Sequence, residues 1–167
     1  MNSKIPYAAL SERIRRVPGG EHIYNVADRA VTVLSVCVYP AVLLILFLED
    51  RRLFLETLLI PASGFVLLSM FRFFFNAPRP YEVFGFSPVL HKNTKGKSFP
   101  SRHVFSIVML AVAFWRIDLR LGICFAILAV ILSFLRVTGG VHFLRDVLFG
   151  AGFAVAWGLF GFLLICR

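Results

Sequence analysis

The stretch Lys97-Ser98-Phe99-Pro100-Ser101-Arg102-His103 lies where a basic loop meets an apolar run of the sequence. Five of these seven residues are polar. Ionisable groups at the entrance of a membrane helix are energetically expensive, and they are usually retained for a function. Two further polar clusters, residues 72–80 before the stretch and residues 136–146 after it, are candidates to share that function.

The composition of the chain identifies a membrane protein. Hydrophobic residues make up 59% of the 167 residues, charged residues only 16%, and the mean hydropathy is +0.81. These values are typical of a chain whose helices face lipid. The net charge of +9 would favour nucleic acid in a soluble protein. Here it fits anionic headgroups and an anionic lipid substrate, so we expect the lipid bilayer as partner and no nucleic acid.

Apolar runs along the chain predict an all-α fold, a polytopic transmembrane bundle of about five spans. Residues 1–30 mix basic and apolar side chains, which predicts an amphipathic interfacial helix ending at Pro18-Gly19-Gly20. Residues 1–20 hold no apolar stretch typical of a signal peptide, so we expect insertion through internal segments. The predicted spans are 31–48, 53–71, 101–115, 121–135 and 147–166.

The only long polar connection between these spans is residues 72–100. A loop of this length in a compact protein is usually functional. We interpret the chain as one domain, 1–167, with residues 72–100 as the loop on its catalytic face.

Alternating helix direction brings the polar clusters to one membrane surface. With five spans, the end of the second, the start of the third, the end of the fourth and the start of the fifth share one face. The residues 72–80, 100–103 and 136–146 fall at these places. Polar interruptions scattered at random along the apolar sequence would have been divided between the two membrane surfaces.

Two histidines and an aspartate in these clusters are candidates for acid–base and nucleophilic chemistry. We expect the last helix to begin just after Gly139-Gly140, which would place His142 and Asp146 one turn apart on one helix face. A carboxylate beside a histidine fixes its tautomer and makes the other ring nitrogen more basic. His103 opens another predicted helix and is a candidate general acid for a leaving oxygen.

Arginines in the same clusters suit phosphate. Arg72, Arg79 and Arg136 carry planar guanidinium groups that match phosphate oxygens, and helix starts near Ser101 and after Gly139-Gly140 would add unpaired N–H groups. Taken singly, each arginine or histidine here is more often an interfacial anchor than a ligand; their shared face favours function. The three cysteines lie in apolar runs without metal-binding spacing, so we expect no metal and no cofactor.

The three clusters together resemble the signature of the type 2 phosphatidic acid phosphatase (PAP2) family of membrane lipid phosphate phosphatases. That signature is Lys-x6-Arg-Pro, Pro-Ser-Gly-His and Ser-Arg-x5-His-x3-Asp. Eight of its eleven positions match with the spacing intact. The chain reads Arg72-x6-Arg79-Pro80, Pro100-Ser101-Arg102-His103 and Leu135-Arg136-x5-His142-x3-Asp146.

The resemblance implies a metal-independent phosphatase with a phosphohistidine intermediate on His142. It implies that Asp146 orients His142 and that His103 protonates the leaving group. The residues implied to hold the phosphate are Arg72, Arg79, Ser101 and Arg136. Members of the family usually have six spans, so the amphipathic N-terminus would stand in for the first.

The chain departs from the signature at three positions. Arg72 replaces a lysine, Leu135 replaces a serine, and Arg102 replaces a small glycine beside the acid histidine. We hypothesise that Arg102 contacts a second phosphate and favours a diphosphate. The alternative is a side chain turned toward lipid headgroups.

The expected substrate is a membrane lipid phosphate such as an isoprenoid (undecaprenyl) diphosphate, phosphatidic acid or phosphatidylglycerol phosphate. The expected location is the cell membrane. The resemblance implies a site facing outward in bacteria, whereas the excess of basic residues on that face favours the cytoplasm. Three alternatives stay open: a lipid phosphotransferase on the same site, a non-catalytic headgroup-binding or channel protein, and a haem protein. The sequence leaves the oligomeric state undetermined.

Overall fold

The computed structural model describes residues 5–92 and 94–165, and within these residues every regular element is a helix. The chain forms α1 (Ile5–Arg16), α2 (Gly20–Glu49), α3 (Arg51–Phe75), α4 (Pro80–Phe84), α5 (Arg102–Ile117), α6 (Leu119–Thr138), α7 (Leu144–Leu159) and a π-helical end, η1 (Phe160–Ile165). The predicted all-α transmembrane bundle is confirmed.

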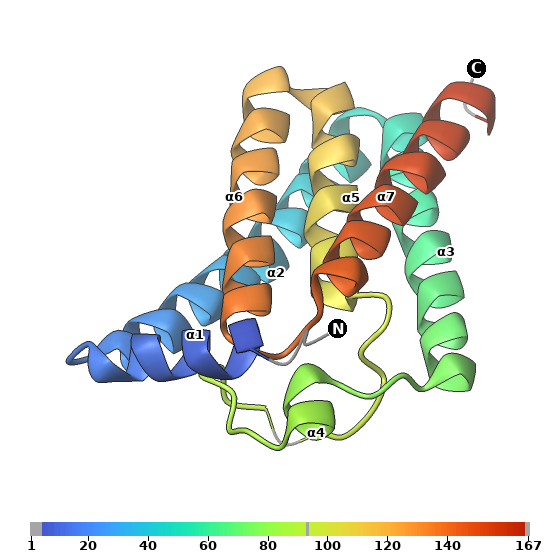
Figure 1. The fold of residues 1–167 in the computed structure, drawn as a ribbon. Coiled ribbons are helices and arrows are strands. Elements are labelled where there is room, and N and C mark those ends of the chain that lie inside the picture. The colour runs from blue at the N-terminus through green and yellow to red at the C-terminus, as the bar shows by residue number, and fades with distance from the viewer. Residues whose placement is uncertain (1–4, 93, 166–167) are drawn as a thin grey trace.

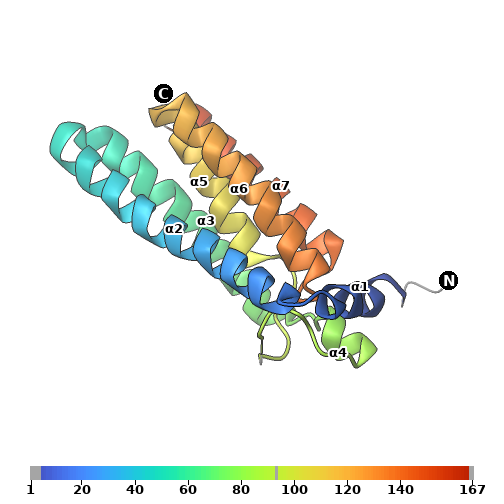
Figure 2. The same ribbon diagram turned by 90° about the vertical axis from the view of Figure 1, so that its left-hand side faces the viewer.

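The five long helices α2, α3, α5, α6 and α7 alternate in direction (Figure 1). The short α1 and α4 lie together at one end of the bundle, where α3 and α6 end and α5 and α7 begin (Figures 1 and 2). Tight turns join the helices at the opposite end: Asp50 and Asp118 each accept a hydrogen bond from a backbone N–H three residues on and so cap α3 and α6. The three polar clusters of the sequence, residues 72–80, 97–103 and 136–146, therefore belong to the end that carries α1 and α4.

Helix α5 is the centre of the bundle. It packs against α3, α6 and α7, and its Phe105 and Phe114 side chains are fully buried. Phe114 meets Phe125 of α6 edge to face, with ring centroids 4.7 Å apart. Such aromatic pairs add about 0.5–1.5 kcal/mol beyond burial of their area. Because α5 is held on several sides, His103 in its first turn and Ser101, which directly precedes it, have a fixed position.

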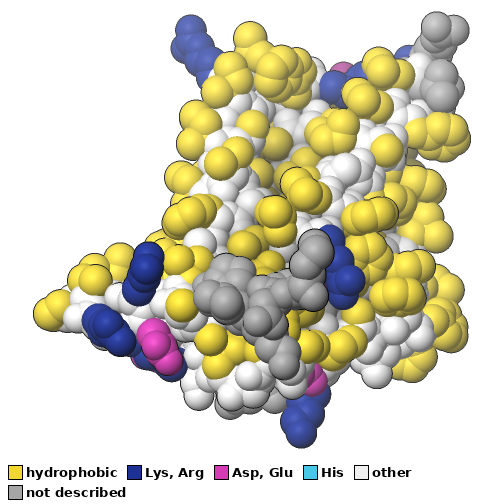
Figure 3. All heavy atoms as spheres, in the orientation of Figure 1, with side chains coloured by type: hydrophobic (Ala, Val, Ile, Leu, Met, Phe, Trp, Pro, Cys, Tyr) yellow, Lys and Arg dark blue, Asp and Glu magenta, His cyan; other side chains and the backbone are white. Residues whose placement is uncertain are grey.

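The outer helices present apolar side chains to the membrane. Val36 of α2 and Val130 of α6 are 66% and 70% exposed, and the face seen in Figure 3 is largely apolar. Among the described residues, four segments are long and apolar enough to cross a bilayer: Gly20–Glu49, Arg51–Phe84, Leu119–Thr138 and Leu144–Leu163. Helix α5 has 16 residues, or about 24 Å of helix. It is shorter than these segments and packs between them.

The start of α2 differs from the sequence prediction. We predicted a span beginning at residue 31, whereas α2 begins at Gly20, directly after Gly19, which turns the chain with φ +75°. The polar residues of the added turns have partners within the protein: Asn25 bonds the backbone of Val89 and His91, and Asp28 pairs with Arg136. Polar groups with such partners do not end a helix.

The start of α7 also corrects a prediction. We expected a helix from just after Gly139-Gly140, but Gly140 adopts φ +79° and α7 begins only at Leu144. The intervening N–H groups are used, since that of His142 donates to Arg136 O and that of Leu144 to Tyr7 Oη. His142 therefore lies in the turn before α7, and the expected anion-binding helix start at Gly140 is absent.

Candidate active site

His142, Asp146 and Ser98 form a buried hydrogen-bonding cluster between the turn before α7 and the long loop. His142 Nδ1 lies 3.5 Å from Asp146 Oδ2, although the two residues do not share a helix as predicted. Ser98 Oγ donates to the same Oδ2 at 2.5 Å, and the N–H of Phe143 donates to it at 3.0 Å. Ser98 and Asp146 are 0% exposed and His142 is 2% exposed. The carboxylate is thus fixed toward Nδ1, which leaves the Nε2 edge of the ring free of this cluster.

Burial keeps His142 uncharged. Loss of water around the ring lowers the pKa of His142 to about 4, although its hydrogen bond with Asp146 opposes this effect. At neutral pH the imidazole is therefore neutral, with one ring nitrogen carrying a lone pair. A neutral imidazole oriented by a carboxylate is the form that acts as a nucleophile.

Two arginines of the first motif hold the long loop through main-chain oxygens. Arg72, at the end of α3, donates to the carbonyls of Lys97, Ser98 and Pro100. Arg79 donates through Nε to Gly96 O at 3.1 Å and through Nη1 to Val141 O at 3.0 Å. Both side chains are buried. These bonds join the loop to the turn that carries His142, and a contact of either arginine with phosphate stays a prediction.

Ser101 precedes α5 and is packed directly against α7. Its N–H donates to Asp146 O at 2.8 Å. Its Oγ is buried and has no hydrogen-bond partner among the described residues. Gly150 permits this approach, because a Cβ at that position would lie 2.6 Å from Ser101 O. A buried hydroxyl without a partner is costly in free energy, so Ser101 Oγ is suited to a ligand oxygen.

His103 and Arg136 line one polar cavity of about 220 Å³. Its wall is completed by residues from α2, from the loop before α5 and from the turn before α7: Asn25, Asp28, Arg29, Thr32, Leu90, His91, Lys92 and Val141. Lys92 faces an excess of positive charge there, and burial together with neighbouring arginines lowers the pKa of its amine. A cavity with several cations and a histidine is suited to an anionic headgroup.

Arg102 points away from this cavity. Its guanidinium carbon lies 5.4 Å from the ring centroid of Phe65 on α3. Together with His103, it lines a second hollow of about 240 Å³ between α2, α3 and α5. His103 thus borders both spaces. Both the diphosphate contact and the alternative, a side chain turned toward lipid headgroups, stay predictions for Arg102.

Sequence reasoning missed three residues that shape the site. Ser98 lies in the polar stretch just before the third predicted span, yet a serine alone gives no sign of a carboxylate partner 48 residues away. Glu82 accepts the N–H groups of Arg79 and Gly96 at 2.8 and 2.9 Å and so fixes the loop. Asp28 pairs with Arg136 and was assigned to the amphipathic segment. The sequence did hold one signal for Glu82: it comes directly after Pro80-Tyr81, where an acidic residue suits a helix start.

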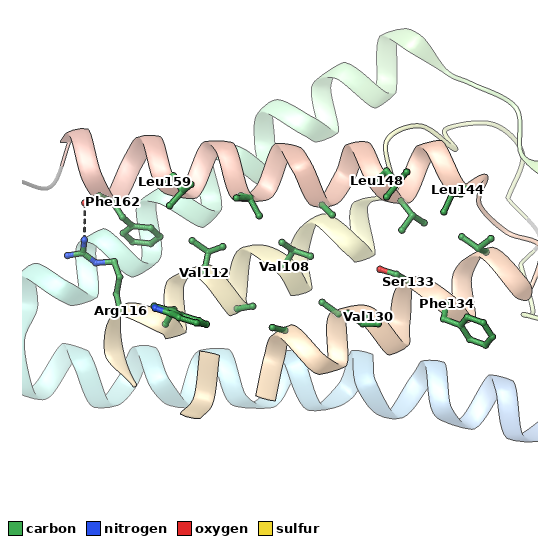
Figure 4. A pocket seen from close by; sticks show the side chains of 18 of the residues that line it. Val108, Val112, Arg116, Val130, Ser133, Phe134, Leu144, Leu148, Leu159 and Phe162 are labelled. Atoms are coloured by element: carbon green, nitrogen blue, oxygen red, sulfur yellow. Dashed lines mark hydrogen bonds between the residues drawn. The ribbon is translucent and has the colours of Figure 1, made fainter. Parts of the chain in front are cut away.

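A large apolar cavity lies elsewhere in the bundle. It has a volume of about 940 Å³ and runs between α6 and α7 over α5, lined by side chains such as Val108, Val130 and Leu148 (Figure 4). At its far end Arg116 donates to Phe162 O at 2.9 Å. None of the predicted site residues lines it. The small polar cavity at His103, rather than this groove, has the chemistry of a reaction site.

Comparisons with known proteins agree with this architecture. The model of the PAP2 superfamily matches residues 51–166, so the chain belongs to the PAP2 superfamily. None of the curated proteins matches the chain.

Two solved structures share the fold. The crystal structure of Aquifex aeolicus LpxE superposes with a TM-score of 0.65 at 22% identity, over 86% of this chain and 92% of that one. The first transmembrane PAP2 type phosphatidylglycerolphosphate phosphatase from Bacillus subtilis gives 0.63 at 22% identity, over 95% and 82%. These two similarities show the multi-pass membrane fold of this chain, and the match over residues 51–166 shows its family.

Proposed function

We propose that this chain is a membrane lipid phosphatase that transfers the phosphoryl group of its substrate to His142 and then to water. The observation that carries the proposal is the buried cluster of Ser98, His142 and Asp146, which presents a neutral, oriented imidazole. Membership of the PAP2 superfamily and the lipid phosphatase named among the solved neighbours support the reaction class.

The first step would form a bond between His142 Nε2 and phosphorus and break the bond from phosphorus to the leaving oxygen. Asp146, fixed by Ser98, would stabilise the positive charge that develops on the imidazole. Burial and the nearby cations lower the pKa of His103. A bound anionic phosphate would offset this effect, so that His103 would be protonated and donate its proton to the leaving oxygen. In the second step water would attack the phosphohistidine, His103 would accept the water's proton, and inorganic phosphate would be released.

The phosphate would lie where the cavity of His103 and Arg136 approaches His142, whose chain neighbour Val141 lines that cavity, with Ser101 Oγ as a further donor. Arg72 and Arg79 would contribute their positive charge from behind the loop that they hold. The lipid chain would extend from the polar cavity into the hollow between α2, α3 and α5, because His103 borders both the cavity and the hollow. The proposed substrates are an isoprenoid diphosphate, phosphatidic acid or phosphatidylglycerol phosphate. The outward orientation of the site also stays a prediction.

The test is release of phosphate from a panel of lipid mono- and diphosphates in detergent, with a chelator present. Wild type is expected to release phosphate and His142→Ala is not. His22→Ala removes an exposed histidine of α2 and is the matched control, expected to behave as wild type. A thermal unfolding curve for each variant separates loss of chemistry from loss of fold.

Three outcomes would contradict the proposal. Phosphate release by His142→Ala would contradict the role of His142 as nucleophile. Loss of wild-type activity with chelator would contradict metal independence. Phosphate transfer that depends on an added lipid acceptor would indicate the phosphotransferase instead.

A further inference from the structure

We propose that Asp28 of α2 is a positioning residue for Arg136, which it holds in the orientation required to bind the phosphate of the substrate. Asp28 lies outside residues 51–166, the part of the chain that the superfamily model matches. The inference rests on the proposed function and adds to it a residue of the N-terminal helix.

The pair is a close ion pair with one hydrogen bond. Arg136 Nη2 donates to Asp28 Oδ2 at 2.9 Å. Nε lies 2.7 Å from Oδ1, but these two atoms form no hydrogen bond with each other. The carboxylate therefore lies against the Nε side of the guanidinium group. The planar guanidinium has five N–H donors, so the edge formed by Nη1 and the second hydrogen of Nη2 is left for another ligand.

The environment of the pair makes the contact strong. The Arg136 side chain is 5% exposed and that of Asp28 is 18% exposed. Water competes little for either group, and paired charges in such surroundings interact more strongly than pairs at the surface. The two residues are 108 positions apart and join α2 to the end of α6. Arg136 is thus held from a helix that carries none of the signature motifs.

Both residues line the polar cavity that also contains His103. An arginine with a long, flexible side chain loses conformational freedom when it binds phosphate. A carboxylate that already fixes the guanidinium removes much of that cost, as pre-organised groups do in general. Asp28 itself would not touch the phosphate, since its negative charge repels it. Its effect reaches the substrate through Arg136.

The experiment compares Asp28→Asn with wild type by steady-state kinetics and by inhibition with inorganic phosphate. The amide has the shape of the carboxylate without its charge, so we expect KM and the inhibition constant of phosphate each to rise about tenfold. The value of kcat is expected to change less, because Arg136 would hold the phosphate in the ground state as well as in the transition state. Asp28→Glu keeps the charge and is expected to restore part of the loss.

Glu56→Gln is the matched control. Glu56 of α3 also pairs with an arginine of another helix, since Arg116 Nη2 lies 3.3 Å from its Oε2, but the pair is at the opposite end of the bundle. It is expected to leave KM and phosphate inhibition unchanged. A second readout is the double variant Asp28→Asn/Arg136→Ala. If Asp28 acts through Arg136, the double variant is no worse than Arg136→Ala alone.

Three results would overturn the inference: wild-type phosphate inhibition in Asp28→Asn, tighter phosphate binding in that variant, or additive losses in the double variant. Tighter binding would mean that Asp28 competes with phosphate for Arg136. If wild type released no phosphate from any lipid, the proposed function would fail. Calorimetric titration of wild type and Asp28→Asn with inorganic phosphate would then still decide the role of Asp28.

Discussion

Replacing Ser98 by alanine tests the buried cluster at its least expected member. Ser98 Oγ is one of two donors to Asp146 Oδ2 that do not belong to His142; the other is the N–H of Phe143. A hydrogen bond to a charged group contributes about 1.5–3 kcal/mol. Without it, Asp146 keeps its place in the fold but is held less firmly toward the imidazole.

The magnitude follows from when that bond matters. The imidazole of His142 gains positive charge only as phosphorus is attacked, so the orientation of Asp146 affects the transition state more than the bound substrate. If the full 1.5–3 kcal/mol is lost there, formation of the phosphoenzyme slows by about 10- to 150-fold. The lipid KM is expected to stay near that of wild type.

The assay is single-turnover formation of the acid-labile phosphohistidine at saturating lipid, followed by rapid quenching. Ser133→Ala is the matched control, because Ser133 lies in the apolar groove between α6 and α7, which none of the predicted site residues lines. Thermal unfolding of both variants records any change in stability. A rate for Ser98→Ala indistinguishable from wild type would refute the role assigned to the cluster.

Three further predictions use other parts of the site. Because burial lowers the pKa of His142 to about 4, protonation is expected to slow phosphoenzyme formation only as the pH falls through about 4, and a single-turnover rate constant that already falls near the ordinary histidine value of about 6.5 would contradict this. Gly150→Ala is expected to lower both the melting temperature and kcat/KM, since its Cβ would lie 2.6 Å from Ser101 O. At Gly152 in the same helix an added Cβ meets nothing within 4 Å, so Gly152→Ala is expected to raise the free energy of unfolding by up to about 1 kcal/mol. Arg102→Gly is expected to lower kcat/KM for a lipid diphosphate more than for a monophosphate, because a cation–π contact of about 0.5–1 kcal/mol is weaker than a charge-assisted bond to phosphate; an unchanged preference would contradict the second-phosphate contact.

The fold was largely predictable because hydropathy determines it. Apolar runs bounded by charged turns gave the long helices, and the tight turn at Asp50 lies where the sequence places it. The start of α2 was not predictable, because Asp28 reads as the end of a membrane span unless its partner Arg136 is known. A single sequence shows no contact between residues 108 positions apart.

The candidate site was predictable in its composition and only partly in its geometry. Spacing identified His142 and Asp146 as neighbours, and they are neighbours, but through a turn whose Gly140 has a positive φ rather than along one helix. Ser98 was missed because serine is common in loops. The direction of Arg102 depends on the ring of Phe65, which no local pattern indicates.

The way Arg72 and Arg79 hold the long loop has a consequence for how the protein can diverge. Both guanidinium groups bond to main-chain oxygens of residues 96–100 and 141, which every amino acid supplies. Side chains at exposed positions of this loop, such as Lys95, can therefore be exchanged without removing the bonds that fix its path. Mutational drift and deliberate redesign of headgroup preference can therefore both change the exposed side chains of this loop while its backbone, and buried members such as Ser98, stay in place.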